Sequence, residues 1–223
     1  MTILLFGATG SAGGSVLDVC LASDDVREVR VMTRRPLART HPKLRVAVRA
    51  DFNSYSGAEG FFADVDACLF CLGKSVQQVS GEAEYRIITR DFAIAAARML
   101  QAGSPAGVFH YLSGRGAHLQ SRFMWARVKA EAERDLLELC GAVCWRPAAI
   151  DGKPSTSEPW LYGTIRPLYR LFSPIRSLYV TGDDIGRAML QARRERVRAS
   201  VIENTEIRAM ADRAKKGVGR GIS

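Results

Sequence analysis

The sequence predicts an α/β fold, a parallel β-sheet with helices on both faces, from three observations. Short runs of β-forming residues alternate with segments of helical periodicity through most of the chain, as in parallel sheets. The first run, residues 2–6, is apolar, as expected for a strand that is buried on both faces. A glycine-rich turn follows this run and opens a helix. Together these features favour a doubly wound sheet of the Rossmann type.

The elements follow one another in the order that such a sheet requires. Strands are expected at residues 2–6, 28–33, 44–48, 67–71, 107–112, 142–145, 177–180 and 200–203. Helices are expected through residues 16–21, at 55–62, 82–102 and 123–140, and from residues 183 and 205 onward. Apolar side chains at helical spacing support the long helix 82–102. Gly141 ends the helix 123–140.

Length and composition fit one domain. The chain has 223 residues, of which 47% are hydrophobic, and this is ordinary for a globular protein with a full core. We expect a single domain over residues 1–214, in which residues 151–214 form a small C-terminal α/β subregion over the sheet edge. Residues 215–223 lack apolar periodicity, and we expect them to form a flexible tail.

The chain is basic, with a net charge of +9. Such a balance suits nucleic acid, a membrane surface or an anionic small molecule. The one dense basic run, residues 193–198, has no interleaved aromatic side chain, so it is interpreted as the solvated end of a helix rather than a nucleic-acid groove. The sequence shows no secretion signal and no apolar stretch of the ~20 residues that a membrane helix needs. We therefore expect a cytoplasmic protein with no membrane contact.

Five cysteines and three histidines limit the redox and metal chemistry. An odd number of cysteines in a chain of enzyme size favours reduced thiols in the cytosol. Cys68 and Cys71 have the spacing of a redox motif, but they lie in an apolar run, which favours buried strand cysteines. The histidines show no ligand spacing with the cysteines, so no metal site is expected.

The turn at residues 7–14 reads Gly-Ala-Thr-Gly-Ser-Ala-Gly-Gly. Its G-x-x-G-x-x-G spacing, after a strand and before a helix, is the context of a dinucleotide-binding site. One glycine allows the tight turn, another lets the backbone approach the pyrophosphate, and the last allows the helix to pack closely on the strand. Free N–H groups at the helix N-terminus attract the phosphates. The expected cofactor contacts are Gly7, Thr9, Gly10, Ser11, Ala12 and Gly13, and a structural turn without a ligand is the alternative.

The residues at the end of the second strand indicate which of the two nicotinamide dinucleotides, NAD(H) or NADP(H), is bound. Sites for NAD place an acidic residue there to hold the ribose 2′-hydroxyl, but this chain has Arg34 and Arg35 and no acid. Glu28 lies too early, at the start of the strand. Guanidinium groups bind a phosphate in bidentate fashion, so NADP(H) is favoured and NAD(H) stays possible. Two solvated loop arginines are the alternative interpretation.

Two further segments are expected beside the same groove. Asp51 follows the third strand, where its carboxylate can accept from the adenine amino group while Phe52 packs nearby; a helix N-cap is an equal alternative for Asp51. Cys71, Leu72 and Gly73 end the fourth strand, and Gly73 would let a loop pass close to the adenosine half of the cofactor.

Taken in order, the motifs along residues 1–210 resemble the short-chain dehydrogenase/reductase superfamily in its atypical, extended-like branch. The resemblance rests on residues 7–13, Arg34–Arg35, Cys71–Leu72–Gly73, Tyr111–Leu112–Ser113–Gly114, Lys129, Arg146–Pro147 and residues 180–186. The order is most similar to the Tat-interacting oxidoreductase-like proteins and to bacterial NAD(P)H-binding relatives of the epimerase-dehydratase type. The resemblance is specific for the superfamily and not for a substrate.

The resemblance implies a catalytic Tyr and Lys one helical turn apart, as Y-x-x-x-K. Lys129 matches the lysine, which by the resemblance lowers the pKa of the tyrosine and holds the nicotinamide ribose of the cofactor. Trp125, however, occupies the position of the tyrosine. An indole N–H is a donor that does not titrate usefully, so it cannot serve as the proton shuttle of general acid–base catalysis. His118, on the preceding loop, is a candidate replacement, although a loop histidine is more often simply exposed.

The resemblance also implies a role for residues that follow two later strands. Ser113 matches the serine that polarises a substrate carbonyl, with a turn cap as the alternative. Arg146 and Pro147 are expected to line the nicotinamide end, with a structural ion pair as the alternative for Arg146. Tyr111 falls on the strand itself and is expected in the core. The aromatic side chains at Trp160, Tyr162, Tyr169 and Phe172 can line a substrate cleft or pack in the core or against a second subunit.

Two functions are compatible with these residues. The first is an NADP(H)-dependent oxidoreductase, such as a reductase of a small carbonyl or quinone substrate, in which the cofactor supplies the hydride. The second is a non-catalytic NADP(H)-binding redox sensor or partner-binding module, which Trp125 favours. Nucleic-acid binding ranks far below both. The expected assembly is a monomer or a homodimer, with a small molecule as the main partner.

Overall fold

A computed structural model describes residues 1–153 and 175–218. Seven parallel strands form one sheet in the order β3-β2-β1-β4-β5-β6-β9. The strands are β1 (Thr2–Phe6), β2 (Glu28–Thr33), β3 (Leu44–Val48), β4 (Ala67–Phe70), β5 (Val108–Leu112), β6 (Val143–Arg146) and β9 (Ser200–Glu203). The doubly wound parallel sheet predicted from the sequence is therefore confirmed, with the first three strands at their predicted bounds.

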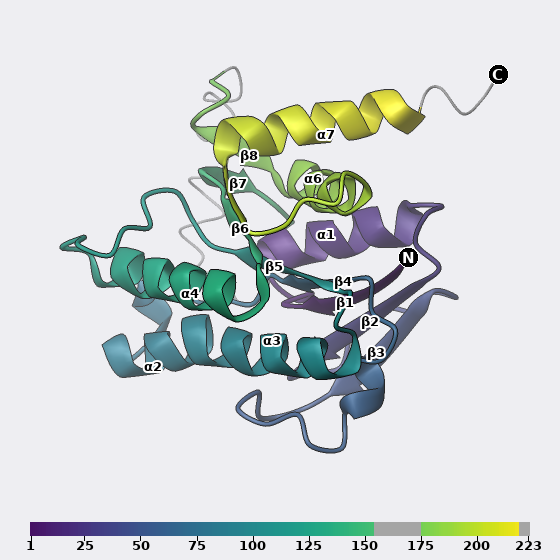
Figure 1. Ribbon diagram of the computed structural model, residues 1–223, viewed down its shortest axis with the longest axis horizontal. Coiled ribbons are helices and arrows are strands. Elements are labelled where there is room, and N and C mark those ends of the chain that lie inside the picture. Colours follow the sequence, from purple (N-terminus) through teal and green to yellow (C-terminus); the bar gives the residue numbers. More distant parts are fainter. Residues whose placement is uncertain (154–174, 219–223) are drawn as a thin grey trace.

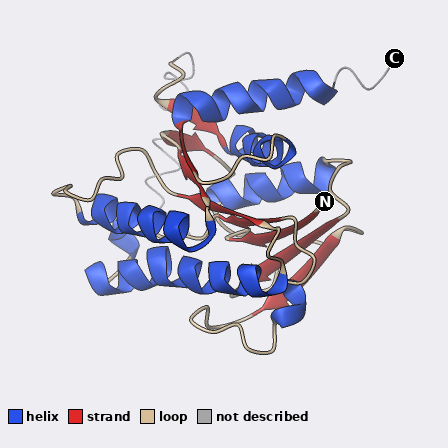
Figure 2. Cartoon of the chain, viewed as in Figure 1, coloured by secondary structure: helices blue, strands red, loops and turns tan. Residues whose placement is uncertain are grey.

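Helices cover both faces of this sheet (Figures 1 and 2). One face carries α1 (Ser11–Ala22), α6 (Gly182–Arg194) and α7 (Asn204–Val218), and the other carries α2 (Glu82–Arg86), α3 (Phe92–Gly103) and α4 (Met124–Cys140). Two hydrophobic clusters follow from this arrangement. Trp145 and Val31 belong to the cluster under α1 and α6, and Phe6 and Phe70 belong to the cluster under α3 and α4.

The long helix predicted over residues 82–102 is interrupted by one π-helical turn, Ile87–Asp91. The Tyr111 hydroxyl, from β5, donates to the carbonyl oxygen of Thr89 inside this turn at 3.0 Å. A π-turn shifts the i→i−4 pattern of the helix by one residue, and such a shift is not visible in apolar periodicity. The helix predicted at residues 55–62 is only a 3₁₀ turn, Glu59–Phe61.

The C-terminal part adds a small second sheet and a longer helix than predicted. Strands β7 (Ala149–Asp151) and β8 (Tyr179–Thr181) pair in parallel. Helix α7 continues to Val218, beyond the predicted domain end at residue 214, so Lys215 belongs to a helix and not to a tail. No helix within the described residues is long and apolar enough to cross a membrane.

The basic run at residues 193–198 does lie at the end of a helix, α6, but three of its four arginine side chains are bound to the protein. Arg193 pairs with Asp66, and Arg194 pairs with Asp25. Arg198 donates to the carbonyl oxygen of Ala106 at 2.6 Å. These arginines fasten α6 and the turn after it to loops at the amino ends of the strands.

Candidate functional site

The glycine-rich turn lies at the carboxyl edge of the sheet, between two neighbouring strands. Phe6, the last residue of β1, is in register with Met32 on β2 and with Phe70 on β4. Gly7 therefore begins the turn beside the ends of both strands, where ligands bind in open α/β sheets.

Two glycines of the turn are required by close contacts. Gly7 has φ +80°, and a Cβ added there would lie 2.5 Å from the carbonyl oxygen of Cys71. A Cβ on Gly13 would lie 2.1 Å from the carbonyl oxygen of Gly7. Gly7 thus makes the sharp turn, and Gly13 lets α1 pack onto the end of β1, as the dinucleotide fingerprint demands.

The N-terminus of α1 is built to receive an anion. Its N-cap is Gly10, and no side chain among the described residues caps the first turn. The first N–H groups of a helix have no partner within the helix, so those around Ser11, Ala12 and Gly13 face the turn with the positive end of the helix dipole. A dinucleotide pyrophosphate fits this cradle.

Arg34 and Arg35 follow β2 at the same edge. Both are exposed, and neither guanidinium has an ion-pair or hydrogen-bond partner among the described residues. The turn that carries them is fixed by Thr33, whose buried hydroxyl donates to the carbonyl oxygen of Arg35 at 3.0 Å. Two guanidinium groups without a partner among the described residues, beside the glycine turn, fit a phosphate.

The segments after β3 and β4 contain the predicted contacts with the adenosine half of the cofactor. Asp51 is exposed, and its carboxylate accepts from the backbone N–H of Asn53 at 2.8 Å, a local turn. Phe52 is 1% exposed, and its ring packs on Phe6, so it belongs to the core and does not offer a face to adenine. A Cβ on Gly73 would meet nothing within 4 Å, so the surrounding protein does not itself require glycine there.

Ser113 and Lys129 meet at the other side of the edge, after β5. The Lys129 ammonium donates a hydrogen bond to the carbonyl oxygen of Ser113. Burial lowers the pKa of Lys129 to about 8, and the nearby carboxylate of Glu133 opposes this effect. The buried hydroxyl of Ser113 has no hydrogen-bond partner among the described residues. An ammonium and a free hydroxyl therefore stand together at the end of a central strand.

Trp125 and His118 lie beside this pair in different settings. A Cβ on Gly116, in the loop after β5, would lie 3.5 Å from the Trp125 ring, so the indole packs against that loop. His118 is exposed, and its Nδ1 accepts from the backbone N–H of Gln120 at 3.3 Å. The structure thus places His118 in a surface turn, as its alternative interpretation held.

Arg146 requires a correction. Its guanidinium binds the buried carboxylate of Glu133 in bidentate fashion at 2.6 and 3.0 Å and also binds Glu203 at 3.1 Å. It forms the structural ion pair that was the alternative interpretation, because two carboxylates occupy its donors. Pro147 is buried, and its carbonyl oxygen accepts from the N–H of Arg115 at 2.9 Å. Arg146 therefore links β6 to α4 and β9, and Pro147 holds the loop after β5.

Sequence reasoning missed two residues that shape the site. Glu133 lies one turn beyond Lys129 on α4, and this spacing signals a shared helix face. Lys153 lies beside the glycine turn: its backbone N–H donates to the carbonyl oxygen of Ser11 at 3.1 Å, and its ammonium pairs with Asp18. No local pattern signals this contact, because it joins residues far apart in the chain.

The cysteines, Tyr111, the metal ligands and the aromatic segment remain from the sequence predictions. Cys68 is fully buried, Cys71 is partly buried, both are free, and burial raises the pKa of both thiols. Tyr111 is in the core, as expected. Within residues 1–153 and 175–218, no cluster of three or more His, Cys, Asp or Glu side chains could hold a metal ion. The aromatic residues Trp160, Tyr162, Tyr169 and Phe172 lie outside the described residues.

Comparison with solved structures agrees with this geometry. The chain superposes with a TM-score of 0.68 on an oxidoreductase of the short-chain dehydrogenase/reductase family from Burkholderia thailandensis, at 15% identity over 100% of this chain and 98% of that one. It superposes with a TM-score of 0.70 on DesIV, a dTDP-glucose 4,6-dehydratase from Streptomyces venezuelae with NAD bound, at 16% identity over 98% and 81%. The chain has the fold of the short-chain dehydrogenases/reductases. At these identities the likeness shows the fold alone.

Comparison with curated proteins adds relatives of known name. The chain is 25% identical over 218 residues to Protein FMP52, mitochondrial, of Eremothecium gossypii, covering 93% of this chain and 96% of that protein. It is 27% identical over 141 residues to Protein HTATIP2 of Rattus norvegicus, covering 62% and 57%. The latter matches the Tat-interacting oxidoreductase-like group predicted from the motifs. No family model matches the chain.

The predicted cytoplasmic location is wrong by this comparison. Relatives from Chaetomium globosum, Aspergillus oryzae, Eremothecium gossypii and Candida albicans are all named mitochondrial. The prediction rested on reduced cysteines and on the lack of a secretion signal. Neither observation separates the cytosol from another compartment that keeps thiols reduced, so the inference went further than its evidence.

Proposed function

We propose that this chain is an NADP(H)-dependent reductase of a small carbonyl or quinone compound. The observation that carries the proposal is the pair Arg34 and Arg35, exposed and without a partner among the described residues, next to the glycine turn. A dianionic 2′-phosphate suits two guanidinium groups, whereas a 2′-hydroxyl would need an acceptor there. The bound cofactor would supply the hydride.

Different residues along the carboxyl edge of the sheet would bind different parts of the cofactor and the substrate. Gly7, Gly13 and the first turn of α1 would hold the pyrophosphate, and Arg34 with Arg35 would hold the 2′-phosphate. Ser113, whose hydroxyl is unpaired in the described structure, would donate to the substrate oxygen. The DesIV structure, which shares the fold, is described with NAD, and this supports a nicotinamide cofactor without choosing between NAD and NADP.

A calorimetric titration with NADP⁺ and NAD⁺ tests the choice of cofactor. We expect Arg34→Ala with Arg35→Ala to weaken NADP⁺ binding about 100-fold, roughly 3 kcal/mol, because hydrogen bonds to a charged phosphate are lost. Binding of NAD⁺ should be unchanged. Arg98→Ala with Lys216→Ala, two exposed positions on α3 and α7, is the control that removes the same charge. Equal loss for both cofactors, or for both double variants, would refute the 2′-phosphate site.

A second function, a non-catalytic NADP(H)-binding sensor, is favoured by one residue. Trp125 replaces the tyrosine that the resemblance implies. A panel of ketones, aldehydes and quinones, followed by NADPH absorbance, separates the two functions. Turnover of any member supports the reductase, and tight binding without any turnover supports the sensor.

A further inference from the structure

The reduction of a carbonyl needs a proton as well as a hydride, and the usual donor is missing from this chain. Trp125 stands in the place of the tyrosine, and His118 lies in an exposed surface turn. We propose that the ammonium group of Lys129 is itself the proton donor to the substrate oxygen. This proposal rests on the proposed reductase function, and it gives Lys129 a catalytic role beyond holding the cofactor.

The position of the ammonium is fixed by one hydrogen bond, and Gly114 leaves the room that it needs. Its hydrogen bond to the carbonyl oxygen of Ser113 holds it at the carboxyl end of β5. A Cβ on the next residue, Gly114, would lie 3.2 Å from the Lys129 Nζ, so a larger residue there would crowd the ammonium. One of the three N–H groups of an ammonium is used by Ser113, and two remain to donate.

The Ser113 hydroxyl belongs to the same group of atoms. Ser113 is 3% exposed, and its Oγ has no partner among the described residues. A buried hydroxyl without a partner is costly, and such exceptions call for an explanation. A substrate carbonyl at the end of β5 would accept from this hydroxyl, and the ammonium held on the same residue would donate to the same oxygen.

Burial makes this lysine a usable acid, and one nearby carboxylate works against it. Burial lowers the pKa of Lys129 to about 8, whereas Glu133 on α4 raises it. Arg146 from β6 forms an ion pair with Glu133, and Glu203 from β9 binds the other end of the Arg146 guanidinium. From β5, the Tyr111 hydroxyl is engaged by Thr89 of the π-turn. An acid whose pKa lies near the working pH transfers protons most effectively.

The step balances without another reactant. The carbonyl carbon gains a hydride, with its two electrons, from the reduced nicotinamide, and the C=O π pair moves to oxygen. That oxygen takes one proton from the Lys129 ammonium and becomes the alcohol. The resulting neutral amine recovers a proton from water, so each turnover consumes one solvent proton.

The first test measures the lysine and does not depend on activity. The chain has only six lysines, Lys43, Lys74, Lys129, Lys153, Lys215 and Lys216. In protein labelled with ¹³C at lysine Cε, we expect one resonance to titrate near pH 8 and to be absent from Lys129→Arg, while ordinary lysines titrate near 10.4. If the Lys129 resonance also titrates near 10.4, the proposal is overturned.

The second test follows NADPH oxidation with 9,10-phenanthrenequinone as the probe. The wild-type kcat should fall above about pH 8, as the ammonium loses its proton. Lys129→Arg keeps the charge but does not release a proton, so kcat should fall roughly 100- to 10,000-fold and lose this pH dependence, with NADPH affinity by calorimetry nearly unchanged. His118→Gln should leave kcat within twofold of the wild type.

The outcomes separate this proposal from the function on which it rests. If no dinucleotide binds, the proposed function fails. If NADPH binds and the quinone is reduced equally well by Lys129→Arg, or if His118→Gln loses activity instead, only the lysine proposal fails. Binding of NADPH without reduction of this quinone or of any member of the carbonyl panel overturns both.

Discussion

The two faces of the sheet are held to their helices by different forces. On one face α6 packs directly on α1 through glycines. A Cβ on Gly182 would lie 2.6 Å from Ser15, and a Cβ on Gly186 would lie 3.0 Å from Val19. Backbones that approach this closely exclude water and leave little freedom to shift.

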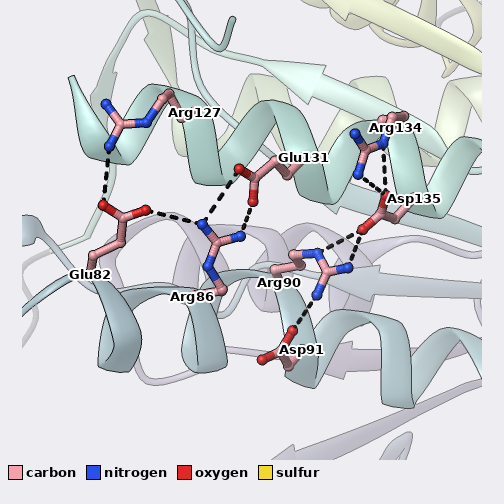
Figure 3. Close-up of polar contacts among 8 residues, drawn as sticks. All are labelled: Glu82, Arg86, Arg90, Asp91, Arg127, Glu131, Arg134 and Asp135. Carbon is pink, nitrogen blue, oxygen red and sulfur yellow. Dashed lines mark hydrogen bonds and ion pairs between the residues drawn. The ribbon is translucent and has the colours of Figure 1, made fainter. Parts of the chain in front are cut away.

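On the other face, arginine–carboxylate pairs join α4 to α2 and to the π-turn (Figure 3). Arg86 binds Glu82 and Glu131, and Arg90 binds Asp135. Together with the pairs Arg127–Glu82, Arg90–Asp91 and Arg134–Asp135, they form a row of ion pairs along α4, here called the ladder. Most of these side chains are partly exposed, so each pair contributes little and is screened by salt.

This difference in packing between the two faces matches the site residues that the helices of each face carry. Helix α1 carries the glycine turn, where a fixed backbone suits a pyrophosphate. Helix α4 carries Lys129, and its exposed ion pairs can rearrange at small cost. The buried pair of Arg146 with Glu133 is the exception on that face. We therefore expect the cofactor end to be rigid and the end with Lys129 to respond to salt and to substitutions.

Among single substitutions, the largest loss of stability is expected at that buried pair. Arg146→Met leaves the Glu133 carboxylate, 4% exposed, without its partner, which should cost roughly 3 kcal/mol of unfolding free energy. Urea denaturation measures it. Glu133→Met in the same chain should recover most of the loss, because a buried ion pair can be replaced by apolar groups. An unchanged midpoint in the single variant would contradict a buried role for the pair.

A somewhat smaller effect is expected where α6 meets α1. Gly186→Leu should lower the unfolding free energy by about 1–3 kcal/mol, because the new side chain has no room against Val16 and Val19. The matched control is Gly217→Ala in α7, where a Cβ would meet nothing within 4 Å. That control should be neutral or slightly stabilising. Equal losses in the two variants would show that helix packing is not the cause.

A pH effect is expected on the glycine-packed face. Burial, with Arg193 and Arg198 nearby, lowers the pKa of His110 to about 3. The folded histidine stays neutral below pH 6.5 while the unfolded one gains a proton. Stability should therefore fall by about 1.4 kcal/mol per pH unit from 6.5 toward 3.

His110→Gln provides the comparison for this pH effect. The Trp145 indole donates to His110 Nδ1 at 3.2 Å, and glutamine keeps an acceptor for that N–H. Between pH 6.5 and 3, the unfolding free energy of the variant should fall less steeply with decreasing pH than that of the wild type, because the contribution of His110 is absent. Parallel curves for the two proteins would mean that His110 is protonated in the folded state.

The smallest effect is expected in the exposed ladder. Arg86→Ala should cost only about 0.5–1 kcal/mol, and the loss should shrink in 0.5 M salt. A double-mutant cycle with Glu131→Ala, run in urea at low and high salt, isolates the pair. A coupling energy that salt does not change would indicate that the ladder is effectively buried, and the contrast between the two faces would disappear.

Local pattern was enough to predict every strand of the main sheet and the glycine turn, but not the short strand β7. Residues 2–6, 28–33 and 44–48 were predicted at their exact bounds, because a short run with β-branched residues that is ended by turn residues has few alternatives. The roles of Gly7 and Gly13 followed from spacing alone. Each of these features depends on residues close together in the chain.

Features that depend on distant partners were missed. The π-turn at Ile87–Asp91 involves Tyr111, and Arg146 was assigned to the cofactor because Glu133 and Glu203 were not recognised as its partners. Phe52 was assigned to adenine because its neighbours in the aromatic core come from β1, β4 and α3. In each case a single sequence shows the residue type but not the tertiary contact that occupies it.

The position of α6 bears on how the chain folds during synthesis. Helix α1 and the glycine turn occupy the first 22 residues, but their covering helix begins at Gly182, and Arg194 reaches back to Asp25. Contacts across so many residues form slowly, because a long loop must close first. On the ribosome, the apolar side of α1 stays uncovered until α6 has been made, and that interval is when a nascent chain is most exposed to aggregation and most in need of a chaperone.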